Sequence, residues 1–223
     1  MYEKFVKRIM DIVCALLAII VFSWLYIIVA VLVRIKLGSP VIFKQKRPGK
    51  DEKIFTLYKF RTMTDERDEN GELLPDDVRL TKFGKFLRST SLDELPEAFN
   101  ILFGHMSVVG PRPQLIRDMV FMTPEQRRRH SVRPGLSGLA QISGRNGITW
   151  ERKLELDLEY IENMSFLFDM KIIFLTVWTA FVKKDGISQE GMDTAEDLGD
   201  YLLHTHKITQ ADYNTGMQIS REL

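Results

Sequence analysis

Residues 88–113, RSTSLDELPEAFNILFGHMSVVGPRP, hold side chains whose types and spacing could carry out chemistry. The carboxylates Asp93 and Glu94 are adjacent, with Arg88 upstream and Arg112 downstream. Adjacent acids can bind a divalent cation, for which we expect Mg²⁺, and a carboxylate can also act as a nucleophile. Arginine presents a planar fork of donors that suits phosphate oxygens. Together these groups indicate a phosphoryl-transfer site, in which positioning and charge neutralisation carry most of the catalysis.

Pro96 limits where a helix can begin in this stretch. Proline lacks an N–H and is harmless only in the first helical turn, so we expect the helix to start between about Ser91 and Asp93. Gly104 is expected to end the helix. The spacing of the apolar residues predicts a buried face made of Leu95, Phe99 and Leu102.

At a helix N-terminus, Asp93 and Glu94 have two alternative roles. Acids there complement the positive end of the helix dipole, and Ser91 with Glu94 matches a capping box, so the pair could be structural. A helix N-terminus also binds phosphate readily, and two acids would repel that ligand unless a divalent cation bridged them. The two roles are compatible, because the capping position is also the position where phosphate and Mg²⁺ would gather.

Arg112 is held between two prolines. Pro111 has a fixed φ angle, and Pro113 pushes Arg112 toward extended geometry. A guanidinium on so stiff a segment loses little entropy when it binds an anion. We therefore expect Arg112 to bind a phosphate group.

Residues 12–33 form an uncharged run of 22 residues. At about 1.5 Å per residue, a helix of this length reaches about 33 Å, roughly one hydrocarbon core. The run is too long for a secretory signal, and no small-residue cleavage site follows it. Basic residues mark the cytoplasmic side of a membrane, and here they lie on both flanks. They are Lys4, Lys7, Arg8, Arg34, Lys36, Lys44, Lys46 and Arg47. A straight span and a helix that returns to the same leaflet both stay open.

The net charge of +1 conceals an uneven distribution. Residues 185–223 carry a net charge of −6, which leaves +7 for the remainder. A basic body next to a membrane segment favours anionic headgroups or phosphorylated substrates as ligands, and we expect the acidic tail to be a solvated appendage. Cys14 is the only cysteine, so no internal disulfide can form.

The remaining patterns indicate an α+β fold: a mostly helical membrane-associated domain with an N-terminal hydrophobic helix, amphipathic interfacial helices and a small β element. Residues 37–49 and 53–63 have the turn signals and the alternation of short strands. A charged loop over 64–77 follows, and the glycine-rich residues 133–147 are expected to form a loop. The expected helices cover 78–89, which is basic and suits either a membrane surface or a core, 122–130, 148–164 and the interfacial or core segment 165–184, with two small helices in the tail.

Several functional signatures are absent. No phosphate-loop, dinucleotide-binding, zinc-protease, Cys-x-x-Cys or Gly-x-Ser-x-Gly motif occurs. An ATPase, a dinucleotide dehydrogenase and a serine hydrolase are therefore poorly supported. His204 and His206 are two residues apart, a spacing that does not place them on one helical face, so we expect no metal site there.

The order and wording of several motifs resemble the monotopic phosphoglycosyl transferases, also called bacterial sugar transferases, in their minimal single-domain form. The matching pieces are KRIMD, GSPVIFKQKRPG, YKFRTM, the long stretch over 88–113, RPGLSGLAQISGRN and LELDLEYIENMSF. They cover roughly residues 1–185. The resemblance implies a membrane-anchoring helix over residues 1–36 and a catalytic domain over 37–185, and it leaves 186–223 as an acidic C-terminal appendage.

The resemblance also implies a reaction. Members of this family transfer a sugar 1-phosphate from a UDP-sugar to polyprenyl (undecaprenyl) phosphate, release UMP and so initiate a glycoconjugate or polysaccharide pathway. They work in two steps through a covalent aspartyl intermediate, require Mg²⁺, and lie in the bacterial inner (cytoplasmic) membrane with the catalytic domain on its cytoplasmic face. The expected partners are the donor, the acceptor and membrane phospholipids. Nucleic acid is not expected, and the oligomeric state is open, with a homo-oligomer among the options.

Carried over motif by motif, the resemblance implies roles for individual residues. Asp93 would be the nucleophile that attacks the sugar-bearing phosphate, and Glu94 would hold Mg²⁺ or manage protons, so both are candidate metal ligands. The residues that would neutralise phosphates are Lys59, Arg88, Arg112 and Arg145. The residues that would contact the nucleotide end of the donor are Pro111, Arg112 and Pro113.

The family anchors itself by a helix that is broken at a Ser-Pro pair and returns to the leaflet that it entered. This chain has Trp24 after Ser23, so the kinking proline is missing. With basic residues on both flanks, we expect the re-entrant form. Two other functions stay open, a membrane-bound Mg²⁺-dependent nucleotide-sugar pyrophosphatase and a non-catalytic membrane scaffold. The sequence identifies neither the sugar nor the purpose of the tail, although small members of the family often use N-acetylated amino-deoxy UDP-sugars.

Overall fold

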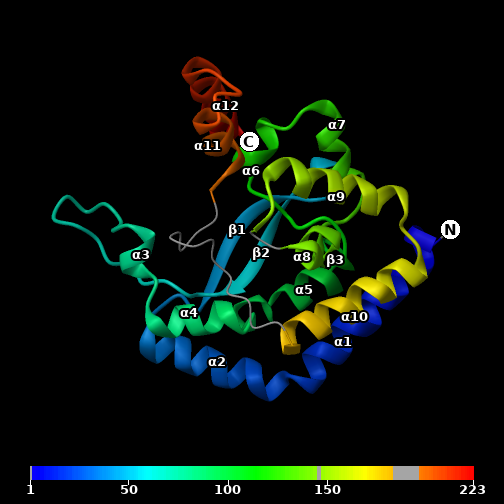
Figure 1. Cartoon of the computed structure of the whole chain (residues 1–223). Helices are drawn as coiled ribbons and strands as arrows, with labels where there is room; N and C mark the ends of the chain where they lie inside the picture. Colours follow the sequence, from blue (N-terminus) through cyan, green and yellow to red (C-terminus); the bar gives the residue numbers. More distant parts are fainter. Residues whose placement is uncertain (1, 145–146, 183–195) are drawn as a thin grey trace.

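A computed structural model describes residues 2–144, 147–182 and 196–223 (Figure 1). The described chain is mostly helical, and it contains two small sheets of two strands each, as an α+β fold requires. Its elements in chain order are η1 (Tyr2–Val6), α1 (Lys7–Val21), α2 (Ser23–Lys36), β1 (Ile42–Pro48), η2 (Lys50–Glu52), β2 (Ile54–Phe60), α3 (Asp76–Arg79), α4 (Lys82–Ser89), η3 (Leu92–Glu94), α5 (Glu97–Leu102), β3 (Ser107–Val109), α6 (Ile116–Val120), α7 (Pro124–Arg127), η4 (Arg128–Ser131), β4 (Gly135–Ser137), α8 (Leu139–Ser143), α9 (Trp150–Glu162), α10 (Phe166–Val182), α11 (Leu198–His204) and α12 (Gln210–Glu222).

The N-terminal apolar run folds as two helices that meet at a bend of 64°. The break falls at Phe22, between α1 and α2, where no proline or glycine is present. Within the described residues no single helix is long and apolar enough to cross a membrane, whereas this bent pair meets the same criteria when its halves are taken together. The two halves have different packing partners: Ala15 of α1 joins the cluster around Ile101, and Val33 of α2 joins the cluster around Leu87. Figure 1 shows α10 next to α1 and α4 next to α2.

Buried polar groups fasten α1 to the rest of the chain. The ammonium group of Lys7 lies 2.5 Å from the carboxylate of Asp169 in α10, and both side chains are buried. The carboxylate of Asp11 accepts hydrogen bonds from the hydroxyl of Ser107 (2.8 Å) and the backbone N–H of Val108 (2.9 Å). Since breaking a buried ion pair leaves an uncompensated charge, these contacts define one position for α1.

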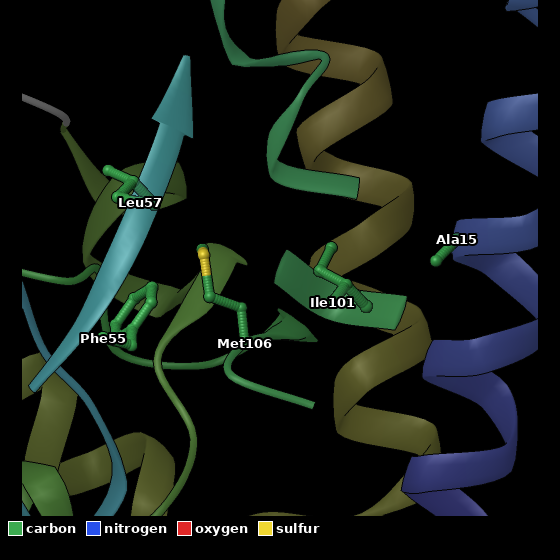
Figure 2. Packing of buried hydrophobic residues seen from close by; sticks show 5 residues of the cluster. All are labelled: Ala15, Phe55, Leu57, Ile101 and Met106. Atoms are coloured by element: carbon green, nitrogen blue, oxygen red, sulfur yellow. The ribbon is translucent and has the colours of Figure 1, made fainter. Parts of the chain in front are cut away.

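The predicted strands form an antiparallel hairpin. β1 pairs with β2 in a register that places Ile42 opposite Phe60 and Pro48 opposite Ile54. Phe55 and Leu57 lie two residues apart and therefore point to the same face. Figure 2 shows these two side chains facing the core, with Met106 beside them and with Ile101 of α5 between Met106 and Ala15 of α1. The hairpin and the N-terminal helix thus share one core cluster.

Helix α5 lies between the bent pair and the hairpin, and its fully buried face differs from the prediction. Leu95, Phe99 and Leu102 are only partly buried, whereas Glu97, Ala98, Asn100 and Ile101 are buried. The reason is that both sides of α5 are covered. Its apolar side faces the bent pair, where Phe99 makes an edge contact with Tyr26, and its polar side faces β2.

The polar side of α5 is bound to the backbone of β2. The side chain of Asn100 donates to the carbonyl of Thr56 (2.7 Å) and accepts from the N–H of Tyr58 (3.0 Å). At the other end of α5, the guanidinium of Arg8 donates to the carbonyls of Ile101 (2.6 Å) and Leu102 (2.7 Å). The Ile101 carbonyl also accepts from the N–H of Gly104 (3.0 Å), and Arg8 adds a donor to the Leu102 carbonyl at the helix end, beyond the intrahelical hydrogen bonds.

Residues 133–144 of the glycine-rich segment form regular structure where we predicted a loop. They contain strand β4, which pairs in parallel with β3, and helix α8. A Cβ atom on Gly135 would lie 2.1 Å from the backbone nitrogen of Gly110, and one on Gly138 would lie 2.2 Å from the Gly110 carbonyl oxygen. The glycines therefore permit a close approach between two backbone segments, which sequence periodicity does not reveal.

The other predicted helices are confirmed with changed ends. The predicted helix over 78–89 divides into α3 and α4, because Thr81 caps α4 by accepting from the N–H of Gly84 (3.1 Å). The capping box of Thr123 and Gln126 forms at the start of α7 as expected. The tail forms the two small helices α11 and α12, but they pack on the protein and are not a solvated appendage. Leu198 is 3% exposed, and its N–H donates to the carboxylate of Asp118 in α6 (2.9 Å).

Candidate active site

Four separate elements bring the predicted site residues together. Lys59 lies near the end of β2, Arg88 lies in the last turn of α4, Asp93 and Glu94 lie in the short 3₁₀ turn η3, and Arg112 lies in the loop after β3. The positions are far apart in sequence, so the site exists only because the hairpin, α4, α5 and the β3–β4 sheet pack together. Arg145 lies outside the described residues, and its role stays a prediction.

The helix does not begin where Pro96 led us to expect. Asp93 and Glu94 occupy η3, and the α-helix α5 starts only at Glu97, after Pro96. Ser91 has a left-handed backbone with φ 55° and makes no capping bond, so the predicted capping box with Glu94 is wrong. A capping residue normally has an extended backbone, which would let its side chain accept from the following turn. The two acids therefore lie in a separate turn before the helix.

Glu94 is bound by two cations from different elements. Its Oε1 atom lies 2.8 Å from Nζ of Lys59 and 2.5 Å from Nη2 of Arg112. Burial alone would raise the pKa of Glu94, but the charges of Arg112 and Lys59, and the hydrogen bonds from them, outweigh burial and lower the pKa well below its usual range. Glu94 is therefore ionised at neutral pH and joins β2, η3 and the Arg112 loop.

Asp93 has a different environment from its neighbour. Its side chain is buried, and it forms no hydrogen bond or ion pair with any residue that the structure describes. Burial, followed by the charge of Glu94, raises the pKa of Asp93 to about 6, against the opposing effect of Lys59, Arg88 and Arg112. The carboxylate thus carries a charge near neutral pH with both of its oxygen atoms unoccupied, which is what a nucleophile needs.

Arg88 is a basic group with free capacity beside Asp93. Its Nε donates to the hydroxyl of Thr62 (3.1 Å), and among the described residues it has no acid partner. The charge of Arg88 lowers the pKa of Asp93, so the two groups are close enough to interact. A guanidinium with unfilled donors next to a carboxylate without donors is suited to an anionic ligand between them.

The Pro-Arg-Pro segment presents a partly exposed guanidinium on a buried backbone. Pro111 and Pro113 are buried, whereas 41% of the Arg112 side chain is exposed. Glu94, more than any other neighbour, raises the pKa of Arg112. The exposed part of Arg112 can therefore reach a ligand while Glu94 holds its position.

Sequence reasoning missed a third acid of the site, Glu97. Its Oε1 lies 3.2 Å from Nζ of Lys59, and the side chain is 2% exposed. Burial raises the pKa of Glu97 to about 7, although Lys59 opposes this shift. The signal in the sequence was the spacing of Glu97 and Asn100, which places both polar residues on one helical face. The buried face that we predicted, Leu95, Phe99 and Leu102, includes neither residue.

The acids fit a magnesium ion that a substrate helps to hold. The described residues include no group of three or more His, Cys, Asp or Glu side chains arranged to hold a metal. However, both cations on Glu94 use Oε1, so Oε2 accepts no hydrogen bond from described residues, and Asp93 is likewise free. Mg²⁺ usually takes one or two carboxylates together with substrate phosphates and water, which suits this donor set.

The chain is similar to known proteins over most of its length. A family model described as bacterial sugar transferase matches residues 2–183. The chain is 52% identical over 190 residues to an uncharacterized sugar transferase, EpsL, of Bacillus subtilis (strain 168), a match that covers 85% of this chain and 94% of that protein. It is 45% identical over 193 residues to a UDP-glucose:undecaprenyl-phosphate glucose-1-phosphate transferase of Klebsiella pneumoniae, over 80% of this chain and 40% of that one.

A relative with a different sugar in its name is also similar. The UDP-N-acetylgalactosamine-undecaprenyl-phosphate N-acetylgalactosaminephosphotransferase of Aeromonas hydrophila is 39% identical over 183 residues, which cover 78% of this chain and 43% of that protein. The matches thus cover less than half the length of the Klebsiella and Aeromonas transferases.

The raised pKa of Asp93 predicts a stability change that does not depend on any substrate. Because the folded pKa lies above that of the unfolded chain, the contribution of Asp93 to stability is full below about pH 4 and is lost as pH rises through about 6. At pH 8 the free energy of unfolding of Asp93→Asn should therefore exceed that of the wild type by up to about 3 kcal/mol, which gives the variant the higher unfolding temperature. The difference should vanish near pH 4.

Thermal unfolding of the detergent-solubilised protein at the two pH values measures this difference. Asp77→Asn, at an exposed position of α3, is the matched control for the replacement of an aspartate by asparagine. An Asp93→Asn variant that is equally or less stable than the wild type at both pH values would contradict the assignment.

Proposed function

The chain belongs to the bacterial sugar transferase family, and on this basis we propose that it transfers a sugar 1-phosphate from a UDP-sugar to undecaprenyl phosphate, releasing UMP. The main support is the contrast between the two adjacent acids. Glu94 is held through its Oε1 atom by Lys59 and Arg112, while Asp93 is buried without a hydrogen-bond or ion-pair partner among the described residues. The names of the Klebsiella and Aeromonas relatives state this type of transfer for those proteins.

The proposed reaction has two displacements at one phosphorus atom. First, a carboxylate oxygen of Asp93 attacks the sugar-bearing phosphorus of the donor, and the bond from that phosphorus to the bridging oxygen breaks, so that UMP leaves with the bond's electron pair. Second, a phosphate oxygen of undecaprenyl phosphate attacks the same phosphorus, and the bond to Asp93 breaks. The carboxylate is regenerated, and the product is undecaprenyl diphospho-sugar. An acyl phosphate keeps its transfer potential, which suits a second transfer to phosphate.

The basic residues around Asp93 stabilise the charge that moves in both steps. Arg88, with free donors, would bind the phosphate under attack, and the exposed part of Arg112 would bind the phosphate of the leaving UMP. Lys59 holds Glu94 and Glu97 and so sets the charge balance next to the nucleophile. Mg²⁺, when bound by Glu94 and Asp93 with the donor, would neutralise further phosphate charge.

We also propose that the bent pair α1–α2 enters and leaves one leaflet of the cytoplasmic membrane and that the site faces the cytoplasm. Both ends of the pair contact the same folded body. Near the first end, Glu3 lies 2.5 Å from Lys50 of η2, and after the second end Leu37 packs with Phe60 of β2. A straight span would place residue 3 across the membrane from Lys50 and would break this contact.

Exposed apolar side chains support the same placement. They continue from α1 and α2 onto α10, and a surface of this kind on a soluble protein would be unusual. The residues are Ile9, Leu17, Ile20, Trp24, Ile27, Ile35, Leu167, Phe174 and Trp178. A bilayer that covers this surface would bring the lipid acceptor to the level of the site, with α4 and its exposed Phe86 at the interface.

Two alternatives predict different products from the same acids. A nucleotide-sugar pyrophosphatase would use water and would release sugar phosphate and UMP without a lipid acceptor. A non-catalytic scaffold would release no UMP, and its activity in the pathway would depend on the tail and not on Asp93. The absence of any hydrogen bond from described residues to Asp93 favours a reactive group over a structural one.

The first prediction from this proposal concerns turnover. In the presence of Mg²⁺ and undecaprenyl phosphate, the protein should release UMP from at least one sugar in a panel of UDP-glucose, UDP-N-acetylgalactosamine and N-acetylated amino-deoxy UDP-sugars. Asp93→Asn and Asp93→Ala should reduce kcat by about 10³-fold or more, because each removes the nucleophile. Asp77→Asn should retain wild-type turnover. Near-normal turnover in either Asp93 variant, or repeated UMP release beyond one equivalent per enzyme in the absence of the lipid, would contradict the proposal.

The second prediction concerns topology. A single cysteine at position 4, introduced as Lys4→Cys with Cys14→Ser, should react with a membrane-impermeant maleimide only after intact cells are permeabilised, because a re-entrant helix keeps position 4 on the cytoplasmic side. Asp77→Cys, in the folded body, is the cytoplasmic reference. Labelling of position 4 in intact cells that leave position 77 unlabelled would show a straight span.

A further inference from the structure

The Pro-Arg-Pro segment can be held by its backbone only through carbonyl oxygens and the one N–H of Arg112, since prolines have no N–H to donate. All three carbonyls of the segment have donors. The Pro111 carbonyl accepts from the N–H of Gly135 (2.9 Å), the Arg112 carbonyl from Nη2 of Arg129 (2.6 Å), and the Pro113 carbonyl from Nη1 of Arg47 (3.2 Å). The position of the Arg112 guanidinium therefore depends on groups outside the segment.

Arg129 donates to the backbone carbonyl of Arg112, whose guanidinium binds Glu94. The guanidinium of Arg129 forms an ion pair with Asp157, with Nε at 2.9 Å and Nη2 at 2.8 Å from the Oδ2 atom. The side chains of Arg129 and Asp157 are 1% and 3% exposed. Because the guanidinium is planar and its donors are fixed relative to one another, an ion pair on one edge determines where Nη2 can meet a carbonyl.

Helix α9 carries Asp157, and it also contacts strand β3, which directly precedes the Pro-Arg-Pro segment. Asp157 and Tyr160 are three residues apart on α9. The hydroxyl of Tyr160 donates to the carboxylate of Asp169 (2.7 Å), and its oxygen also lies 3.2 Å from the carbonyl oxygen of Val109 in β3. One face of α9 thus reaches the chain just before and at the Pro-Arg-Pro segment. Trp150 and Leu154, both buried, pack α9 against α11 and so fix it in place.

A fully buried ion pair is poor evidence for stability alone, because apolar residues of similar volume are often equally stabilising. In addition to its contacts with Asp157, Arg129 donates from Nη2 to the Arg112 carbonyl, a directional hydrogen bond that apolar residues could not supply. We infer that Arg129, oriented by Asp157, is a positioning residue for Arg112, fixing the guanidinium that holds Glu94 and binds the donor phosphate. This inference rests on the proposed transfer reaction for its kinetic consequence, but its structural consequence can be measured without substrate. The neighbouring residue Arg128 differs from Arg129, because Arg128 is half exposed and pairs with Glu125 on the surface.

The test replaces the ion pair by apolar residues in the double variant Arg129→Met/Asp157→Leu. This change should keep the protein folded, with a thermal midpoint near that of the wild type, while the Arg112 carbonyl loses its donor. Hydrogen–deuterium exchange should rise in peptides that cover residues 107–118, and exchange in the β1–β2 hairpin should stay unchanged. The kcat/KM for the UDP-sugar should fall by about 10²-fold, the size expected from a small misplacement of a catalytic group. Arg128→Gln is the matched control and should change none of these values.

A double-mutant cycle with Arg112→Lys separates positioning from general damage. If Arg129 acts through the Arg112 guanidinium, the double variant should lower kcat/KM by less than about twofold when Arg112 is already lysine. Equal losses in both backgrounds, or unchanged exchange with unchanged kcat/KM, would overturn the inference. Should the double variant fail to fold, Arg129→Lys, which keeps the charge next to Asp157 but lacks the fork, provides the same readouts. If the wild type transfers no sugar phosphate, the proposed function fails, and the exchange data alone decide whether Arg129 positions the segment.

Discussion

The ion pairs of Glu94 are the interaction on which the site depends. One carboxylate oxygen binds Lys59 from β2 and Arg112 from the loop after β3, so a single acid joins the hairpin, the turn η3 and the Pro-Arg-Pro segment. Because Glu94 engages these cations, its neighbour Asp93 remains buried without a donor from the part of the chain that the structure describes. Two chemically similar acids thus acquire different properties from their surroundings: Glu94 stays ionised, and Asp93 has a raised pKa and unoccupied oxygen atoms.

Buried polar contacts connect this site to the N-terminal helix. Arg8 and Asp11 of α1 bind the end of α5 and the start of β3, and Asn100 binds α5 to β2. Each contact joins a charged or amide side chain to a backbone group of another element, so the relative positions of these elements have few alternatives. The height of the site above the bent pair α1–α2 follows from the same contacts. In a protein whose acceptor is a lipid phosphate, that height decides whether the acceptor can reach Asp93.

Local features of the sequence predicted much of this arrangement. The hairpin followed from turn signals and alternation. The motif resemblance assigned Lys59 and Arg112 to the same site as the acids, but as phosphate-binding residues and not as partners of Glu94. The errors share one physical cause, which is contact between distant segments. We predicted a capping role for Ser91 from Glu94 three residues later, but Ser91 has a left-handed backbone between α4 and η3. We predicted a loop around Gly135 and Gly138 from the local glycine content, but these glycines allow β4 to approach Gly110. The Arg129–Asp157 pair links positions 28 residues apart, and no local pattern marks it.

The central claim is that Asp93 carries the sugar phosphate between donor and acceptor. The most direct measurement is mass spectrometry of the protein after incubation with UDP-sugar and Mg²⁺, without a lipid acceptor, followed by an acid quench and proteolysis. The account predicts that the peptide containing Asp93 gains the mass of one sugar phosphate and loses it when undecaprenyl phosphate is added. A modification on another residue, or rapid acceptor-dependent UMP release with no modified peptide at any time, would contradict the account.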